Sequence, residues 1–121
     1  IGLIFIINLI LKNFWGRSRP NEVIEFGGIN NFTPWYQVAD QCLTNCSFVS
    51  GDSAVGFALI IFYFLVNNKT YLWISMIFGF GIGLLRIMEG GHYISDIVLA
   101  GAIIFVFYSL CYRFYLKIFN V

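Results

Sequence analysis

The chain has 121 residues, of which 60% are hydrophobic, 20% aromatic and 11% charged, and its net charge is +1. A composition this apolar excludes an ordinary soluble domain. The near-neutral charge and the absence of any basic run exclude a typical nucleic-acid-binding protein.

The first apolar run covers residues 1–11, which is too short to span a bilayer alone. It has neither the basic start nor the small-residue cleavage site of a signal peptide. Because the first residue is Ile rather than Met, we expect the chain to begin inside a longer protein. Residues 1–11 are then predicted to be the end of a membrane helix.

Residues 12–49 mix Asn, Gly, Pro, acidic and aromatic residues without a sustained period, which predicts a long loop outside the membrane. Its aromatic content argues against disorder and suits the headgroup level, with a short interfacial helix expected at residues 35–43. Cys42 and Cys46 could form a disulfide, although four residues of separation make the geometry demanding. Cys111 lies in an apolar run and is expected in the core or facing lipid.

Three further apolar segments predict membrane helices at residues 50–66, 71–88 and 97–119. The first two reach the roughly 20 residues of a full span only by including polar residues at their ends. We therefore predict one domain, residues 1–121, with an all-α polytopic transmembrane bundle of about three full spans plus the end of a preceding one. Gly79, Gly81 and Gly83 are expected to permit close helix packing rather than to form a dinucleotide loop.

Alternating crossings place the polar ends of these helices on two sides of the membrane. Four basic residues fall on the side of the long loop: Lys12, Arg17, Arg19 and Arg86. Three fall on the other side: Lys69, Arg113 and Lys117. The plain count does not orient the chain. If Lys12, Arg19 and Arg86 are reserved for a ligand, the positive-inside rule puts the long loop outside the cytoplasm.

Residues 86–96 contain the only histidine of the chain. His92 and Asp96 are four residues apart, so on a helix they share a face and the carboxylate can orient the imidazole. The other ring nitrogen is then free to attack an electrophile. Gly90 and Gly91 end the preceding helix, which lets Arg86 and His92 face one anion. The alternative is a histidine that simply satisfies a nearby carboxylate at a helix start.

Three motifs occur in this order along the chain: Lys12-x6-Arg19-Pro20, Ser50-Gly51-Asp52 and Arg86-x5-His92-x3-Asp96. Together they resemble the type 2 phosphatidic acid phosphatase superfamily, which also includes bacterial acid phosphatases and vanadium haloperoxidases. Leu85 replaces the serine usual before the arginine, and Asp52 replaces the usual histidine. The resemblance implies a membrane enzyme of six helices, of which this chain would hold the end of the third and the last three.

The resemblance also implies roles for single residues. His92 would be the nucleophile that forms a phosphohistidine, and Asp96 would orient it. The phosphoryl group would be bound by Lys12, Arg19, Ser50, Gly51 and Arg86, without a metal or other cofactor. Independently of the family, backbone amides at a helix N-terminus bind anions, which suits Ser50 and Gly51. Asp52 would protonate the leaving group, orient water or a cationic neighbour, or mark a weakened enzyme.

The context Cys46-Ser-Phe-Val-Ser-Gly-Asp52 resembles the lipid A phosphatases within that family. The expected substrate is a phosphorylated lipid, either a monoester or a diphosphate of lipid A-like, phosphatidate-like or polyprenyl type. The protein is expected in the bacterial inner membrane with its site on the periplasmic face. The rival is a catalytically inactive membrane protein of the same fold that binds lipid headgroups.

Two charges near the motifs are expected to lie outside the chemistry. Arg17 is predicted to be an interfacial charge rather than a phosphate ligand, and Glu89 to pair with a neighbour or face solvent. The oligomeric state stays open.

Overall fold

The computed structural model describes residues 2–6 and 10–119. The regular elements within them are helical: α1 (Gly2–Ile6), α2 (Lys12–Trp15), η2 (Pro20–Glu22), η3 (Ile24–Phe26), α3 (Gly51–Phe57), η4 (Ala58–Ile60), α4 (Ile61–Val66), α5 (Lys69–Met88) and α6 (Ile94–Phe119). In this part of the chain, strand-like pairing is limited to an isolated bridge between Val23 and Asn30. Residues 2–6 are helical as predicted, whereas residues 1 and 7–9 of the predicted membrane-helix end lie outside the described residues.

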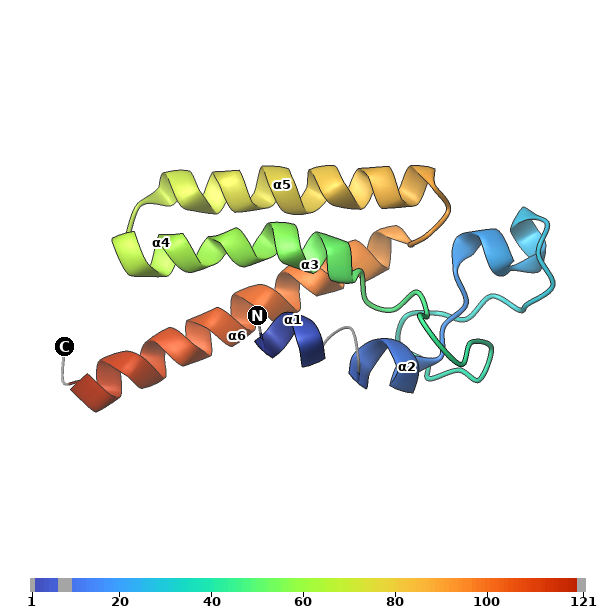
Figure 1. Ribbon diagram of the computed structural model, residues 1–121, viewed down its shortest axis with the longest axis horizontal. Helices are drawn as coiled ribbons and strands as arrows, with labels where there is room; N and C mark the ends of the chain where they lie inside the picture. Colours follow the sequence, from blue (N-terminus) through green and yellow to red (C-terminus); the bar gives the residue numbers. More distant parts are fainter. Residues whose placement is uncertain (1, 7–9, 120–121) are drawn as a thin grey trace.

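The run from α3 to α4 lies antiparallel to α5, and α6 runs obliquely past α3 and contacts α3, α4 and α5 (Figure 1). Helices α5 and α6 are long and apolar enough to cross a membrane, and the run Gly51–Val66 is apolar but shorter. The predicted all-α membrane bundle is therefore confirmed, while its number of spans stays a prediction. The loop between α2 and α3 gathers at the end of the bundle where α5 stops and α3 and α6 begin (Figure 1).

Local sequence signals set the ends of these helices. Ser50 caps α3 by accepting a hydrogen bond from the Ser53 amide, and the Asn68 side chain caps α5 at the amide of Thr70. Asn67 ends α4 in the left-handed conformation. Because the two asparagines are adjacent, α4 and α5 are joined by a tight antiparallel turn.

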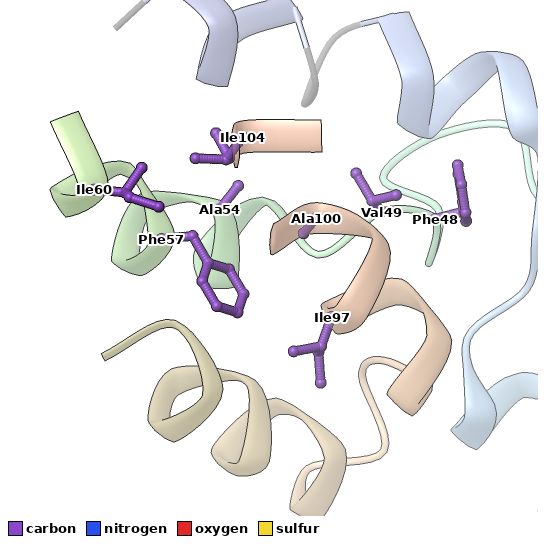
Figure 2. Close-up of a cluster of buried hydrophobic side chains, with 8 residues drawn as sticks. All are labelled: Phe48, Val49, Ala54, Phe57, Ile60, Ile97, Ala100 and Ile104. Carbon is purple, nitrogen blue, oxygen red and sulfur yellow. The ribbon is translucent and has the colours of Figure 1, made fainter. Parts of the chain in front are cut away.

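The core lies where α3 and η4 meet α6 (Figure 2). Its buried side chains are Phe48, Val49, Ala54, Phe57, Ile60, Ile97, Ala100 and Ile104. The helices approach closely at glycines: a Cβ added at Gly56 would lie 2.8 Å from the Gly79 Cα, and one at Gly83 would lie 2.6 Å from Ile97 Cγ2. Close packing is thus confirmed for Gly79 and Gly83. For Gly81 the prediction is wrong, since no atom of another described element lies within 4 Å of a Cβ placed there.

The long loop folds back on α2 instead of forming the helix expected at residues 35–43. That prediction is wrong because the backbone groups there bond to α2: the Ala39 amide donates to the Trp15 carbonyl at 2.9 Å, and Trp15 Nε1 donates to the Trp35 carbonyl at 2.7 Å. Cys42 and Cys46 form the disulfide left open by the sequence, with a Cα–Cα distance of 5.6 Å. The loop is therefore an ordered cover over one end of the bundle.

Candidate active site

His92 and Asp96 form a buried pair at the junction of α5 and α6. His92 lies in the link before α6 and Asp96 in the first turn of α6, and they are 1% and 0% exposed. His92 Nδ1 is 3.8 Å from Asp96 Oδ2, which is longer than a hydrogen bond. Neither ring nitrogen has a hydrogen-bond partner among the described residues. The carboxylate lies on the Nδ1 side, so Nε2 is the nitrogen left for a substrate.

Asp96 is held by groups from three other places in the chain. Arg17 Nη1 lies 2.6 Å from Oδ1, while the Ser47 hydroxyl and the Tyr93 amide donate to Oδ2. The Ser50 amide donates to the Asp96 carbonyl at 3.3 Å, which joins the start of α3 to the start of α6. Hydrogen bonds between charged groups of this kind are short and strong, so the carboxylate has a fixed orientation.

The prediction that Arg17 is an interfacial charge is wrong, because the residue is 2% exposed and ion-paired with Asp96. Its place follows from Gly16, which adopts a φ of +57° after α2. A Cβ at Gly16 would overlap the Ala39 carbonyl, so only glycine permits this turn. Sequence reasoning also missed Ser47, for which the one available signal was its place within the Cys-Ser-Phe-Val-Ser-Gly context.

The two cations of the first motif meet at Asn45. Lys12 Nζ donates to the Asn45 side-chain oxygen at 3.4 Å, and Arg19 Nε and Nη2 donate to the Asn45 carbonyl at 3.1 and 2.9 Å. Arg19 Nη1 also lies 4.0 Å from the position of a Cβ at Gly91, the residue before His92. Arg19 therefore reaches from the loop to the segment that carries the histidine.

Lys12 is within electrostatic reach of the other predicted site residues. Burial lowers the pKa of Lys12 most, and the positive charges of Arg19 and Arg86 lower it further. The negative charges of Asp52 and Asp96 act in the opposite direction. Two guanidinium groups and two carboxylates from separate parts of the sequence thus act on one ammonium group.

Arg86 occupies the last turn of α5, where it contacts two carboxylates. Its Nε is 2.9 Å from Asp52 Oδ2, and its Nη1 pairs with Glu89. Asp52 thus lies against a cationic neighbour, the contact required by one of the alternatives that the sequence left open, and Glu89 pairs as expected. The pairs are partly exposed, with the Asp52 and Glu89 side chains 52% and 60% accessible, so they add little to stability.

Ser50 and Gly51 are both buried at the beginning of α3, as the motif predicted. The Ser50 hydroxyl is engaged with Ser53, donating to its hydroxyl at 3.0 Å and accepting from its amide. To donate to a phosphate, the hydroxyl would have to turn away from Ser53. The hydrogen bond from the Ser50 amide to the Asp96 carbonyl and the pair of Asp52 with Arg86 link the second motif to the third. Arg19 of the first motif lies beside Gly91, so all three motifs lie at one end of the bundle (Figure 1).

A cavity of about 670 Å³ opens beside His92, between the long loop and the ends of α5 and α6. Most of its walls are apolar side chains: Phe26, Phe32, Pro34, Trp35, Ile87, Met88 and Ile94. Its lining includes Arg17 and Tyr93, but not Lys12, Arg19 or Arg86. The cavity therefore suits the apolar part of a ligand, with the predicted phosphate-binding cations Lys12, Arg19 and Arg86 outside it. Within residues 2–6 and 10–119, no three His, Cys, Asp or Glu side chains are grouped to hold a metal.

The family model described as the PAP2 superfamily matches residues 1–120. The lipid A 4'-phosphatase of Francisella tularensis subsp. novicida is 38% identical, and the match covers 93% of this chain and 54% of that protein. Those of Rhizobium etli and Rhizobium leguminosarum are each 35% identical over 82% of this chain, covering 40% and 44% of their lengths. The chain thus spans about half the length of the curated relatives it matches. No solved structure matches it.

Proposed function

Because this chain belongs to the PAP2 superfamily, we propose that it carries the active site of a membrane phosphatase acting on lipids. The observation that carries the proposal is the buried His92–Asp96 pair at the same end of the bundle as Lys12, Arg19 and Arg86. An oriented imidazole beside several cations is suited to attack a phosphate.

In the proposed reaction, His92 Nε2 attacks the phosphorus atom and forms an N–P bond as the bond to the lipid oxygen breaks. Asp96 holds the Nδ1 side of the ring and stabilises the positive charge that develops on it. The departing oxygen takes a proton from Asp52, which must carry one at that moment. Water then attacks the phosphorus atom and gives a proton to the Asp52 carboxylate as the N–P bond breaks, which releases inorganic phosphate and restores the imidazole and the acid.

Lys12, Arg19 and Arg86, with the Ser50 hydroxyl and the Gly51 amide, are proposed to bind the phosphoryl oxygens. Fixed cations stabilise the charge that spreads over these oxygens in the transition state. We propose a metal-independent reaction because the cationic side chains supply the neutralising charge. A phosphoryl group at Arg86 would share the guanidinium with Asp52 and Glu89.

The proposed substrate is a phosphorylated lipid, and lipid A is the first choice because the relatives are lipid A 4'-phosphatases by name. The apolar cavity beside His92 would receive part of the lipid, whose phosphate reaches the cations. The Cys42–Cys46 disulfide supports a periplasmic site in the inner membrane, since disulfides persist in oxidising compartments.

The test is phosphate release from lipid A and from phosphatidate by the purified full-length protein in detergent micelles, with and without a chelator. His92→Ala should abolish release, and a denaturing alkaline quench should trap an alkali-stable, acid-labile phosphohistidine in the parent but not in the variant. Retained turnover in His92→Ala would exclude the histidine as nucleophile. Loss of turnover in chelator would contradict metal independence.

The rival function, lipid headgroup binding without catalysis, is favoured by one observation: Asp52 stands where the family usually has a histidine. A parent protein that binds vesicles containing lipid A but releases no phosphate would support this rival. Phosphate release by the parent would exclude it.

A further inference from the structure

Arg17 is the most enclosed cation among the residues that the structure describes, at 2% exposure. Its Nη1 donates to Asp96 Oδ1 at 2.6 Å and to the Ser95 hydroxyl at 2.9 Å. Its Nε donates to the Thr33 carbonyl, also at 2.9 Å. One guanidinium thus joins the middle of the long loop to the first turn of α6.

The guanidinium is also held from the side by an aromatic ring. Its central carbon lies 3.9 Å from the centroid of Tyr93 and 5.6 Å from that of Phe32, both within cation–π range. Tyr93 directly follows His92, and its amide donates to Asp96 Oδ2. Arg17 therefore contacts Tyr93 and Asp96, the residues that surround His92.

These contacts do not suit Arg17 to bind phosphate. Its Nη1 and Nε donate to protein oxygens and the residue is 2% exposed, so Nη2 alone has no hydrogen-bond partner among the described residues, whereas a phosphate ligand needs several free donors at an open surface. A planar fork of fixed charge is instead the group best suited to pair with a buried carboxylate.

Asp96 needs such a partner, because a fully buried carboxylate without compensation is costly. Its two oxygens have different neighbours. Oδ1 is held by Arg17, whereas Oδ2 receives the Ser47 hydroxyl and lies 3.8 Å from His92 Nδ1. With Oδ1 anchored, the carboxylate cannot turn, so Oδ2 stays on the histidine side.

We propose that Arg17 is a positioning residue: it anchors Asp96 through Oδ1 so that Oδ2 holds the His92 ring with Nε2 towards the phosphorus. This inference rests on the proposed phosphatase function. Arg17 acts through Asp96 and does not touch the substrate's phosphate. Its contribution should therefore appear in the chemical step and disappear when Asp96 can no longer orient the ring.

The experiment is a double-mutant cycle on the full-length protein, with Arg17→Gln, Asp96→Asn and the combined variant, assayed on lipid A in detergent micelles. Arg17→Gln should lower kcat about 10- to 100-fold, the usual cost of losing a group that orients a functional residue. KM should change less than about threefold, since ground-state binding is untouched. In the combined variant, kcat should stay within about threefold of Asp96→Asn, because both changes break one unit.

Arg19→Gln is the matched control, since Arg19 is a loop arginine proposed to bind phosphate. Arg19→Gln should raise KM. Its fold-loss in kcat/KM should multiply with the fold-loss caused by Asp96→Asn, because the two residues act separately. If the losses from Arg17→Gln and Asp96→Asn also multiply, or if Arg17→Gln raises KM while kcat is unchanged, the positioning role is wrong. A kcat equal to that of the parent overturns it as well.

Unfolding of each variant is measured alongside, because Arg17→Gln leaves a buried carboxylate unpaired. If Arg17→Gln does not fold, Arg17→Lys decides, since it keeps the charge but cannot form the fork to Thr33 and Asp96. When Arg17→Lys is combined with Asp96→Asn, kcat must then stay close to that of Asp96→Asn alone. If the two fold-losses in kcat multiply instead, the proposal is overturned. Activity retained by His92→Ala would instead show that the proposed function has failed.

Discussion

Arg86 Nε lies 2.9 Å from Asp52 Oδ2, which ties the last turn of α5 to the first turn of α3. The arginine of the third motif and the acid of the second are thus direct neighbours. Asp52 consequently has two possible contributions, orienting Arg86 and protonating the leaving group. Asparagine separates them, because its side-chain oxygen can stay beside Arg86 but its amide cannot supply the proton.

We predict that Asp52→Asn lowers kcat about 100-fold or more on lipid A, because general acid catalysis contributes roughly 10²- to 10⁴-fold. The loss should be much smaller with p-nitrophenyl phosphate, whose leaving group departs without a proton. Measuring kcat on both substrates checks the prediction. Equal losses on the two would assign Asp52 to the orientation of Arg86 alone.

Lys12 gives a pH prediction. Burial, followed by the charges of Arg19 and Arg86, lowers the pKa of Lys12, so it loses its proton at a lower pH than an ordinary lysine. If the charged form binds phosphate, kcat/KM should fall on the alkaline side as the pH rises through that lowered pKa. Lys12→Arg should move this alkaline limb to higher pH, because arginine stays charged throughout.

The measurement for Lys12 is kcat/KM as a function of pH, which reports groups of the free enzyme. Lys69→Arg is the matched control, since Lys69 begins α5 at the opposite end of the bundle (Figure 1). An alkaline limb that Lys12→Arg leaves in place would show that Lys12 does not control it.

The cysteines test which side of the membrane the loop faces. Cys42 and Cys46 are disulfide-bonded and Cys111 is free. The thiols are trapped by acid-quenching bacterial cells and are then labelled with a maleimide. We predict that Cys111 alone is labelled before reduction, and that Cys42 and Cys46 are labelled only after it. Cys111→Ala serves as the control and should leave the unreduced chain unlabelled. Labelling of all three cysteines before reduction would place the loop in a reducing compartment.

The arrangement of the site was predictable where motif and helix end coincide. Apolar runs alternate direction across the bundle, so the ends carrying Ser50, Arg86 and His92 had to meet at one side. The start of α6 was placed three residues too late, at 97 instead of Ile94. The apolar run begins only after the polar residues Ser95 and Asp96, which is why the helix was expected to start at residue 97. An acidic residue in the first turn nevertheless stabilises the start of a helix, so α6 includes both residues.

The supports of Asp96 were not predictable in the same way. Arg17 and Ser47 are 79 and 49 residues away from it in sequence, and no periodicity connects them. Their contacts depend on how the long loop folds over α2, which is set by bonds such as Ala39 to Trp15 and by the turn at Gly16. An irregular loop has no sequence periodicity, so its contacts with Asp96 could not be predicted from the sequence.

The glycines of α5 give the last prediction, which concerns stability. Gly79 packs against the buried Phe57 ring, and a methyl group there would overlap it, whereas no atom of another described element lies within 4 Å of the Cβ position of Gly81. Gly79→Ala should lower the free energy of unfolding by about 1–3 kcal/mol, the usual cost of overpacking. Gly81→Ala, the matched control on the same helix, should be neutral or raise it by about 0.5–1 kcal/mol, because alanine favours a helix. Thermal unfolding of both variants in one detergent gives the comparison. Equal stability of the two would mean that α3 and α5 are not in close contact at Gly79.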